Sequence, residues 1–193
     1  MKAAIALLLE GAAHAAVRRV ALELHEAGFG LSAAQLPAHV SLKQPFQISS
    51  LTEVETFFDR FASSLEPIDL TLTSLEFWHI DDVVIAFLDV LEDAALRPIH
   101  TRLNAELEAN FGYTPAPFDG EMYHFHATAV IDHATDGTLT AMAARAGERF
   151  DLRTTARSLG LFIFTDDDFA LASFVSYKTL TLEFKTSSLS ANF

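Results

Sequence analysis

Apolar and polar residues alternate with two different periods along the chain. Short apolar runs that are rich in β-branched and aromatic residues, bounded by Gly, Pro, Ser or Asp, predict strands. Longer segments with apolar residues three or four positions apart predict helices. The predicted strands are 2–9, 39–45, 68–80, 83–90, 123–131, 150–165 and 171–184. The predicted helices are 12–27, 52–65, 93–110 and a short helix that begins at Asp136.

Cap and turn residues support these boundaries. Gly28 and Gly112 stand where a helix ends and a positive φ is expected. Residues 52–55 read Thr-Glu-Val-Glu, a capping box that predicts the start of the second helix. Residues 166–168 are all aspartate and predict the turn of a hairpin, and 185–193 predict a frayed tail.

The order of predicted elements is the same in the two halves of the chain. Each half reads strand, helix, strand, helix, strand, and the third predicted element of each half contains a histidine motif described below. We therefore predict a single α+β domain over residues 1–193. It would have two pseudo-symmetric lobes, whose antiparallel or mixed sheets face a central cleft, with one motif in each lobe.

The first apolar run raises the question of a targeting segment. It covers 2–9 and stops at Glu10 and Gly11, which is too short for a membrane span. We expect a buried first strand here rather than a secretion signal. No run of about 18 or more apolar residues occurs elsewhere, so no membrane association is predicted.

Composition indicates a folded protein with a sizeable core, and its lack of cysteine is compatible with a reducing cytosol. Half of the residues are hydrophobic and 17 are Phe, which is ample material for a core. Zero Cys excludes a disulfide framework, a thiolate metal site and a cysteine nucleophile. We expect a cytoplasmic monomer.

The net charge of the protein limits the kinds of molecule that it is expected to bind. The net charge is −13, whereas proteins that bind long nucleic acids need clustered Lys and Arg to contact the phosphate backbone. We therefore expect no binding of a long nucleic-acid backbone. A phosphodiester substrate would be small, such as a nucleotide or an RNA end, or a local basic patch in the acidic protein would hold it.

Two segments repeat one chemical pattern inside predicted strands. Residues 39–42 read His-Val-Ser-Leu and residues 126–129 read His-Ala-Thr-Ala. Side chains alternate across a strand, so positions i and i+2 share a face. The histidine and the hydroxyl of each motif are therefore expected to point in the same direction. By the same spacing Lys43 would share the face of the first motif, and His124 that of the second.

This pattern suits acid–base chemistry at phosphorus. A histidine near its ordinary pKa takes or gives a proton near neutral pH, and a hydroxyl beside it donates a hydrogen bond to an oxyanion. His39 and His126 would supply the acid and the base, in an order that the sequence leaves open. Ser41 and Thr128 would hold the phosphate oxygens. Such an in-line displacement requires neither a metal nor another cofactor, and we predict none.

The two motifs together resemble the two-histidine (2H) phosphoesterase superfamily, the 2′-5′ RNA ligase-like and cyclic phosphodiesterase-like proteins. The residues after the first motif, Lys43 and Pro45-Phe46, are also similar to that family. The resemblance implies the bilobal fold and a phosphoesterase that hydrolyses a small cyclic or 2′-5′ phosphodiester, such as a 2′,3′-cyclic nucleotide. Lys43 would add positive charge at the phosphate, or would be an ordinary surface lysine.

Aromatic residues near the motifs are candidates for stacking on a nucleobase. Tyr123 and Phe46 are the first candidates, followed by Trp78 and Phe118. With so many aromatic residues in the chain, core packing is the competing interpretation for each of them.

Three alternatives stay open. The same site run in reverse would be a 2′-5′ RNA ligase. A catalytically silent protein would keep the pocket as a nucleotide- or phosphate-binding module. A metal hydrolase would use His124 and His126 with Asp132 or His133, since His-x-His is a metal-ligand spacing. The remaining histidines are predicted in turns or on helix surfaces and receive no role: His14, His25, His79 and His100.

Overall fold

Two four-stranded antiparallel sheets form the framework of this computed structural model, which describes residues 1–92, 94–116, 118–165 and 174–185. The strands are β1 (Lys2–Leu8), β2 (His39–Gln47), β3 (Ile68–Ile80), β4 (Val83–Val90), β5 (His126–His133), β6 (Glu148–Ala156), β7 (Ser158–Phe164) and β8 (Phe174–Thr181). The helices are α1 (Gly11–Glu26), α2 (Leu51–Ser64), α3 (Leu96–Phe111), α4 (Asp136–Arg145) and the short 3₁₀ helices η1 (Ser32–Gln35) and η2 (Gly120–Met122).

The strand order places each motif strand at the edge of a sheet. The first sheet has the order β2-β1-β7-β8 and the second has the order β5-β4-β3-β6. We call them the β2 sheet and the β5 sheet. The two edge strands lie against each other across the middle of the molecule. The predicted α+β fold, with two sheets and one motif in each, is thereby confirmed.

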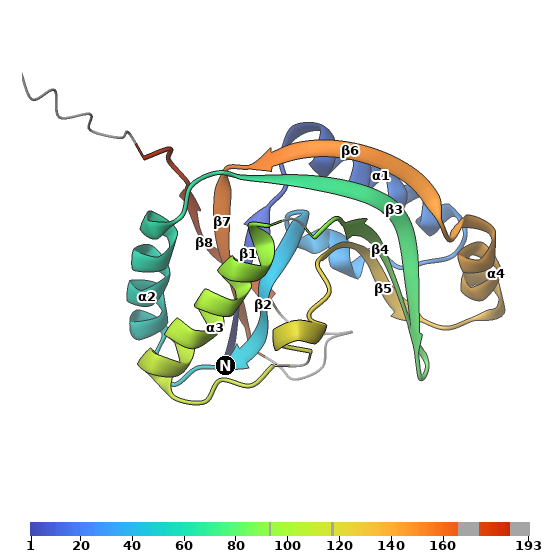
Figure 1. The fold of residues 1–193 in the computed structure, drawn as a ribbon. Helices are drawn as coiled ribbons and strands as arrows, with labels where there is room; N and C mark the ends of the chain where they lie inside the picture. The colour runs from blue at the N-terminus through green and yellow to red at the C-terminus, as the bar shows by residue number, and fades with distance from the viewer. Residues whose placement is uncertain (93, 117, 166–173, 186–193) are drawn as a thin grey trace, which may run out of the picture.

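The helices cover the outer faces of the two sheets. Helices α2 and α3 pack on the β2 sheet, and α1 and α4 pack on the β5 sheet, as Figure 1 shows. Helix α1 directs one apolar stripe inward, and the buried members of this stripe include Val17, Val20 and Leu24. Ser50 accepts a hydrogen bond from the Glu53 amide, so α2 is capped two residues before the predicted capping box.

The sheets exchange strands between the two halves of the chain, which the sequence did not predict. Strand β3 belongs to the first half but pairs with β4 and β6. The segment 150–165, predicted as one strand, is interrupted at Arg157 and supplies β6 to one sheet and β7 to the other. Figure 1 shows β3 and β6 arching over the molecule. Each sheet therefore contains strands from both halves.

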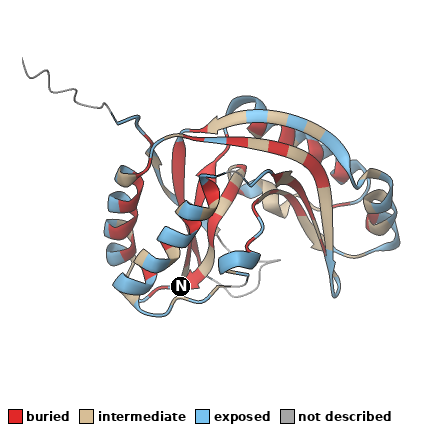
Figure 2. Ribbon diagram, viewed as in Figure 1, coloured by how far each residue is buried: buried red, intermediate tan, exposed pale blue. Residues whose placement is uncertain are grey.

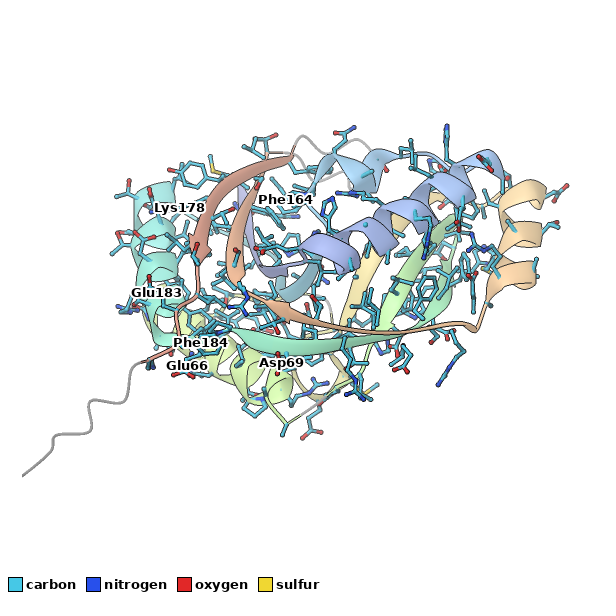
Figure 3. The ribbon with its side chains drawn as sticks, turned by 90° about the horizontal axis from the view of Figure 1, so that it is seen from above. Glu66, Asp69, Phe164, Lys178, Glu183 and Phe184 are labelled. Carbon is cyan, nitrogen blue, oxygen red and sulfur yellow. The ribbon has the colours of Figure 1, made fainter. Side chains whose placement is uncertain are left out.

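The main core lies between each sheet and its covering helices (Figure 2). Strand β1 contributes Ala3, Ile5 and Leu7 to this core, and each of them is fully buried. At the far edge of the β2 sheet, Lys178 of β8 donates hydrogen bonds to Glu55 at 2.8 Å and Asp59 at 2.9 Å, both on α2 (Figure 3).

Strands β7 and β8 pair antiparallel, as the predicted hairpin requires. The aspartates at 166–168, the predicted start of α3 at Asp93 and most of the predicted tail lie outside the described residues. Among the helices that the structure describes, none is both long and apolar enough to cross a membrane.

Candidate active site

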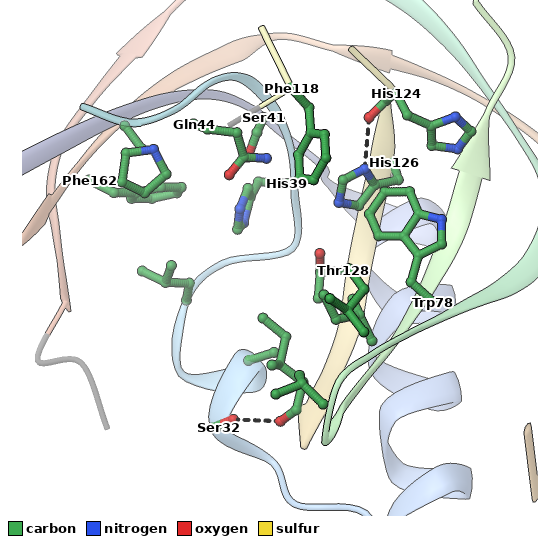
Figure 4. A pocket seen from close by; sticks show the side chains of 18 of the residues that line it. Ser32, His39, Ser41, Gln44, Trp78, Phe118, His124, His126, Thr128 and Phe162 are labelled. Carbon is green, nitrogen blue, oxygen red and sulfur yellow. Dashed lines mark hydrogen bonds between the residues drawn. The ribbon is translucent and has the colours of Figure 1, made fainter. Parts of the chain in front are cut away.

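A cleft of about 680 Å³ opens between the two sheets, and both motifs line it. His39 and Ser41 reach it from β2, whereas His126 and Thr128 reach it from β5. Figure 4 shows the two histidines on opposite walls. The motif residues predicted from sequence are thus brought together. This arrangement is the one that in-line chemistry at phosphorus requires, with one proton-transfer group on each side.

Both motif strands contain a bulge directly after the hydroxyl residue. In β2 the partner of Ser41 is Ala6 and the partner of Lys43 is Ile5, so Leu42 is an extra residue. In β5, Thr128 and Val130 pair with two consecutive residues of β4, so the residue between them is an extra residue in the same way. An extra residue in a strand switches the face of the side chains that follow it.

The bulges change which residues reach the cleft. In β2 both Leu42 and Lys43 point away from the cleft and are buried, and Gln44 lines it instead. In β5 Val130 is fully buried, and Ile131 lines the cleft. The two motifs therefore share a detail of backbone geometry as well as their residue types.

The same hydrogen bond orients each catalytic candidate. Nδ1 of His39 lies 2.8 Å from the carbonyl oxygen of Pro37, and Nδ1 of His126 lies 2.8 Å from that of His124. A carbonyl oxygen only accepts, so Nδ1 carries the proton in both rings. In each ring Nε2 is then the atom that takes or gives a proton.

His39 is partly buried against the β2 sheet. Its ring meets the edge of Phe162 at 4.8 Å between ring centroids. Burial lowers the pKa of His39, and the positive charge of Arg18 lowers it further, while the hydrogen bond to Pro37 opposes both effects. The free protein therefore favours the neutral form of this ring near pH 7.

His126 is held by aromatic neighbours on the β5 sheet. Its ring centroid lies 4.7 Å from that of Trp78 and 5.0 Å from that of Phe87. Burial lowers its pKa from 6.5 to about 4. The hydrogen bond to the His124 carbonyl opposes this shift, whereas the charge that His124 carries when protonated adds to it. Both histidines are thus neutral in the free protein at neutral pH.

Lys43 does not reach the cleft, and the prediction that it shares the face of His39 and Ser41 is wrong. The bulge turns it inward, where its side chain is 1% exposed. Its amino group donates to Asn104 at 2.6 Å and to the Thr114 carbonyl at 2.8 Å, and it forms an ion pair with Asp119. Lys43 ties β2 to α3 and to the loop that follows α3.

His100 is fully buried, although the sequence placed it on a helix surface. Nδ1 of His100 lies 2.8 Å from the Leu42 carbonyl, and Nε2 accepts a hydrogen bond from the Gly120 amide at 3.1 Å. The ring therefore links the β2 bulge to the loop after α3. A pattern in the sequence indicates this position: residue 100 continues the stripe of Leu96, Leu103 and Leu107, all buried.

The candidate stacking residues fall into two groups. Phe46 is buried in the main core, so the prediction that it stacks on a base is wrong. Tyr123 lines the cleft but is 3% exposed, its ring stacks on His100, and its hydroxyl donates to the Ser41 carbonyl at 2.9 Å. Trp78 and Phe118 also line the cleft, and Phe118 is 69% exposed and free to meet a ligand (Figure 4).

The residues of the metal alternative are engaged separately. His124 lies at the edge of the cleft, where its Nε2 is 2.9 Å from Asp89. Asp132 accepts from the Gly30 amide at 2.6 Å, and His133 pairs with Asp82. Within the described part of the chain, no group of three or more His, Cys, Asp or Glu residues is arranged to hold a metal ion.

Solved structures with the same fold extend over nearly the whole chain. One is TT0787 of Thermus thermophilus, with a TM-score of 0.65 and 13% identity, covering 96% of this chain and 100% of that one. E. coli LigT complexed with 3′-AMP has a TM-score of 0.63 and 15% identity, covering 94% and 97%. Kluyveromyces marxianus Usb1 with uridine monophosphate has a TM-score of 0.55 and 12% identity, covering 95% and 98%. At these identities the likeness establishes the fold.

Sequence comparison then assigns the family. No curated protein matches the chain. The model of the 2′-5′ RNA ligase superfamily matches residues 9–168, a span that contains both histidine motifs and most of the two sheets. The resemblance predicted from the two motifs is confirmed: this chain belongs to the 2′-5′ RNA ligase superfamily, whose members are phosphoesterases and ligases.

Proposed function

We propose that this protein is a metal-independent phosphoesterase that hydrolyses a small cyclic or 2′-5′ phosphodiester by two-histidine acid–base catalysis. The observation that carries the proposal is the matched geometry of the two motifs. His39 and His126 stand on opposite walls of one cleft, and in each ring the Nδ1 hydrogen bond leaves Nε2 for the substrate.

The chemistry follows from this arrangement. Water attacks phosphorus as Nε2 of one histidine takes its proton, and Nε2–H of the other histidine protonates the leaving ribose oxygen. Ser41 and Thr128 donate hydrogen bonds to the non-bridging oxygens, where negative charge builds up. The assignment of acid and base depends on the direction of attack. After one turnover the proton has moved between the two rings, and exchange with water resets the site.

The protonation state of the two histidines suggests that the substrate itself helps to protonate one of them. Both rings are neutral in the free protein near pH 7, yet the reaction needs one of them protonated. The negative charge of a bound phosphodiester favours the imidazolium form and raises the pKa of both rings. Protonation would therefore accompany substrate binding.

Ligation by the same groups would require room and charge for two RNA ends. Among the described residues no Lys or Arg side chain lines the cleft. The whole protein carries a net charge of −13. Both facts favour a small substrate, with water as the acceptor.

The test is hydrolysis of a panel of 2′,3′-cyclic nucleotides and 2′-5′ dinucleotides in excess EDTA. Wild type is compared with His126→Ala, and His133→Ala is the matched control, because it removes a histidine from the same strand outside the cleft. We expect turnover by wild type and His133→Ala that survives the chelator and is lost in His126→Ala. Full activity in both His39→Ala and His126→Ala would overturn the site, and loss in EDTA would overturn its metal independence.

A further inference from the structure

Beside His39, Ser41 and Gln44 of β2, the β2 sheet presents mainly apolar residues to the cleft. Strand β1 is apolar on both faces, and Ala4, Ala6 and Leu8 point to the cleft side while the intervening residues join the main core. These three form a second hydrophobic cluster with Leu36, Phe162 and Phe164, separate from the main core. A sheet face that carries no covering helix is usually polar. Here the cluster is itself buried, and its members Leu36, Phe162 and Phe164 give the cleft an apolar wall on this side.

The opposite wall continues this surface. Phe77, Ile85 and Ile131 line the cleft from the β5 sheet. At the rim, Ile80 is 46% exposed and Met122 is 81% exposed. Large apolar side chains held in water at the mouth of a cleft bind an apolar partner by the release of that water.

This surface carries no positively charged side chain among the described residues, and several of the cations form ion pairs elsewhere. All 13 Lys and Arg residues belong to the described residues, and none of them lines the cleft. Lys43 is buried with Asp119, Arg97 pairs with Glu92, and Lys178 pairs with Glu55. Arg18 acts electrostatically on His39 and donates to the Leu36 carbonyl, but it does not line the cleft. A second phosphate on the substrate would therefore touch no Lys or Arg side chain on the described walls of the cleft.

The size of the cleft also exceeds what the reacting group needs. A volume of about 680 Å³ is within the usual range for a ligand with many non-hydrogen atoms. The two histidines and two hydroxyls surround only the phosphate. The remaining walls are mostly the apolar residues described above, with Ser32, Gln44, His79 and His124 among them, and the substituent of the substrate would occupy that space.

We propose that the cleft selects a phosphodiester that carries a single negative charge and a large apolar aryl or alkyl substituent, and that it rejects substrates with a second phosphate. This inference rests on the proposed function and specifies its substrate class. The histidine motifs fix the reacting group, and the apolar walls fix what is attached to it.

The experiment keeps the reacting group constant and changes one distant substituent. The substrates are adenosine 2′,3′-cyclic phosphate with a free 5′-hydroxyl, with a 5′-phosphate and with a 5′-O-benzoyl group. We expect kcat/KM to rise about tenfold from hydroxyl to benzoyl, mainly through KM, because an aromatic ring is removed from water. We expect it to fall about tenfold from hydroxyl to phosphate, and we expect added salt to reduce that difference.

Two variants with the same added charge locate the effect. Ile80→Lys places a cation at the rim of the cleft, whereas Leu22→Lys places one on α1 at a residue that is 57% exposed and does not line the cleft. Ile80→Lys should raise kcat/KM for the 5′-phosphate severalfold and lower it for the benzoyl compound. Leu22→Lys should change neither. Equal effects of the two variants would show that the charge of the whole protein, rather than the cleft, sets the preference.

A binding measurement separates failure of this inference from failure of the proposed function. The fluorescent probe 1-anilinonaphthalene-8-sulfonate is itself a single anion with a large apolar group. It should bind wild type and Leu22→Lys, and the benzoyl compound should displace it better than the 5′-phosphate does. If no substrate turns over but this displacement holds, the hydrolase proposal fails and the binding preference stands. If the 5′-phosphate is hydrolysed or bound as well as the benzoyl compound, the preference is overturned.

Discussion

The two motif strands are alike at the cleft and different behind it. Both carry a bulge after the hydroxyl, and both fix the histidine by the same Nδ1 hydrogen bond at 2.8 Å. Behind β2 lies a buried polar network in which Lys43, His100 and Asp119 connect the strand to α3 and its loop. Behind β5 the corresponding positions are apolar, with Ala129 and Val130 fully buried.

This difference separates the residues proposed to take part in the reaction from the residues that hold the motif strands in place. The symmetric parts are those that would contact a phosphate, and the asymmetric parts are those that hold the strands. A buried ion pair is a weak source of stability but leaves a large penalty when one partner is removed. Substitutions at the cleft should therefore affect the two motifs equally, whereas substitutions behind the strands should not.

The largest expected effect is on the histidines. His39→Ala and His126→Ala should each reduce kcat by about 10³-fold, within the usual range for general acid–base catalysis. The double variant should lose little more than either single variant, since the two groups act as a unit. Steady-state kinetics on the best substrate of the panel measures this. A loss confined to one histidine would break the functional symmetry of the motifs.

The next largest effect is expected behind β2. Lys43→Met should lower the free energy of unfolding by about 3 kcal/mol, because it leaves the partly buried Asp119 carboxylate without its cation. The matched control is Lys178→Met on the open side of β8, which should leave stability nearly unchanged. Urea denaturation measures both. Equal stability of the two variants would show that the network does not support the motif strand.

The hydroxyls should give a smaller and symmetric effect. Ser41→Ala and Thr128→Val should each reduce kcat/KM by roughly 10- to 100-fold, the value of a hydrogen bond to a charged oxygen. Neither should change the denaturation midpoint much, because both side chains face the cleft. If only one of them affects the rate, the phosphate is held from one wall and the symmetric model of the transition state is wrong.

The smallest effect is a shift along the pH axis. The rate for free protein and substrate falls at low pH as the base is protonated, and falls at high pH as the acid loses its proton. Because the pKa of His126 is lowered from 6.5 to about 4 and that of His39 is also lowered, kcat/KM should peak below pH 6.5. The profile of kcat should peak at higher pH, since the bound phosphodiester raises both pKa values.

A variant of His124 tests the lowered pKa of His126 directly. His124→Gln removes a neighbour whose positive charge lowers the pKa of His126, so one limb of the kcat/KM profile should move to higher pH. His133→Ala, in the same strand but away from the cleft, should leave the profile in place. An optimum above pH 7 in wild type would contradict the lowered pKa values.

The sequence predicts the elements and the motif pair because both depend on local pattern. Strand and helix periods need only neighbouring residues, and the i, i+2 rule correctly places Ser41 beside His39. The rule fails for Lys43 because it assumes an uninterrupted strand. Pro45, which lies in an edge strand just after the bulge, was the available warning, since proline in a sheet is confined to edges and bulges.

Long-range pairing could not be read from local pattern. The sequence suggested that each half of the chain builds its own lobe, but hydrogen bonding assigns β3 to the sheet of the second motif. The break at Arg157 lies in a segment too long for an ordinary strand, and its length was the sign of two strands. The environment of His100 was also predictable in part, because its spacing from Leu96 and Leu103 places it on the buried stripe of α3.

The exchange of strands between sheets has a consequence for cutting the polypeptide. The turn at Asp81 and Asp82 is exposed and joins β3 to β4, so a cut there divides the chain with little local damage. One fragment would carry His39 with β1, β2 and β3, and the other would carry His126 with the remaining strands. Neither fragment holds a complete sheet. The proposed turnover would then require the two pieces to reassemble, so the cleaved protein would serve as a fragment-complementation reporter in which hydrolysis signals association.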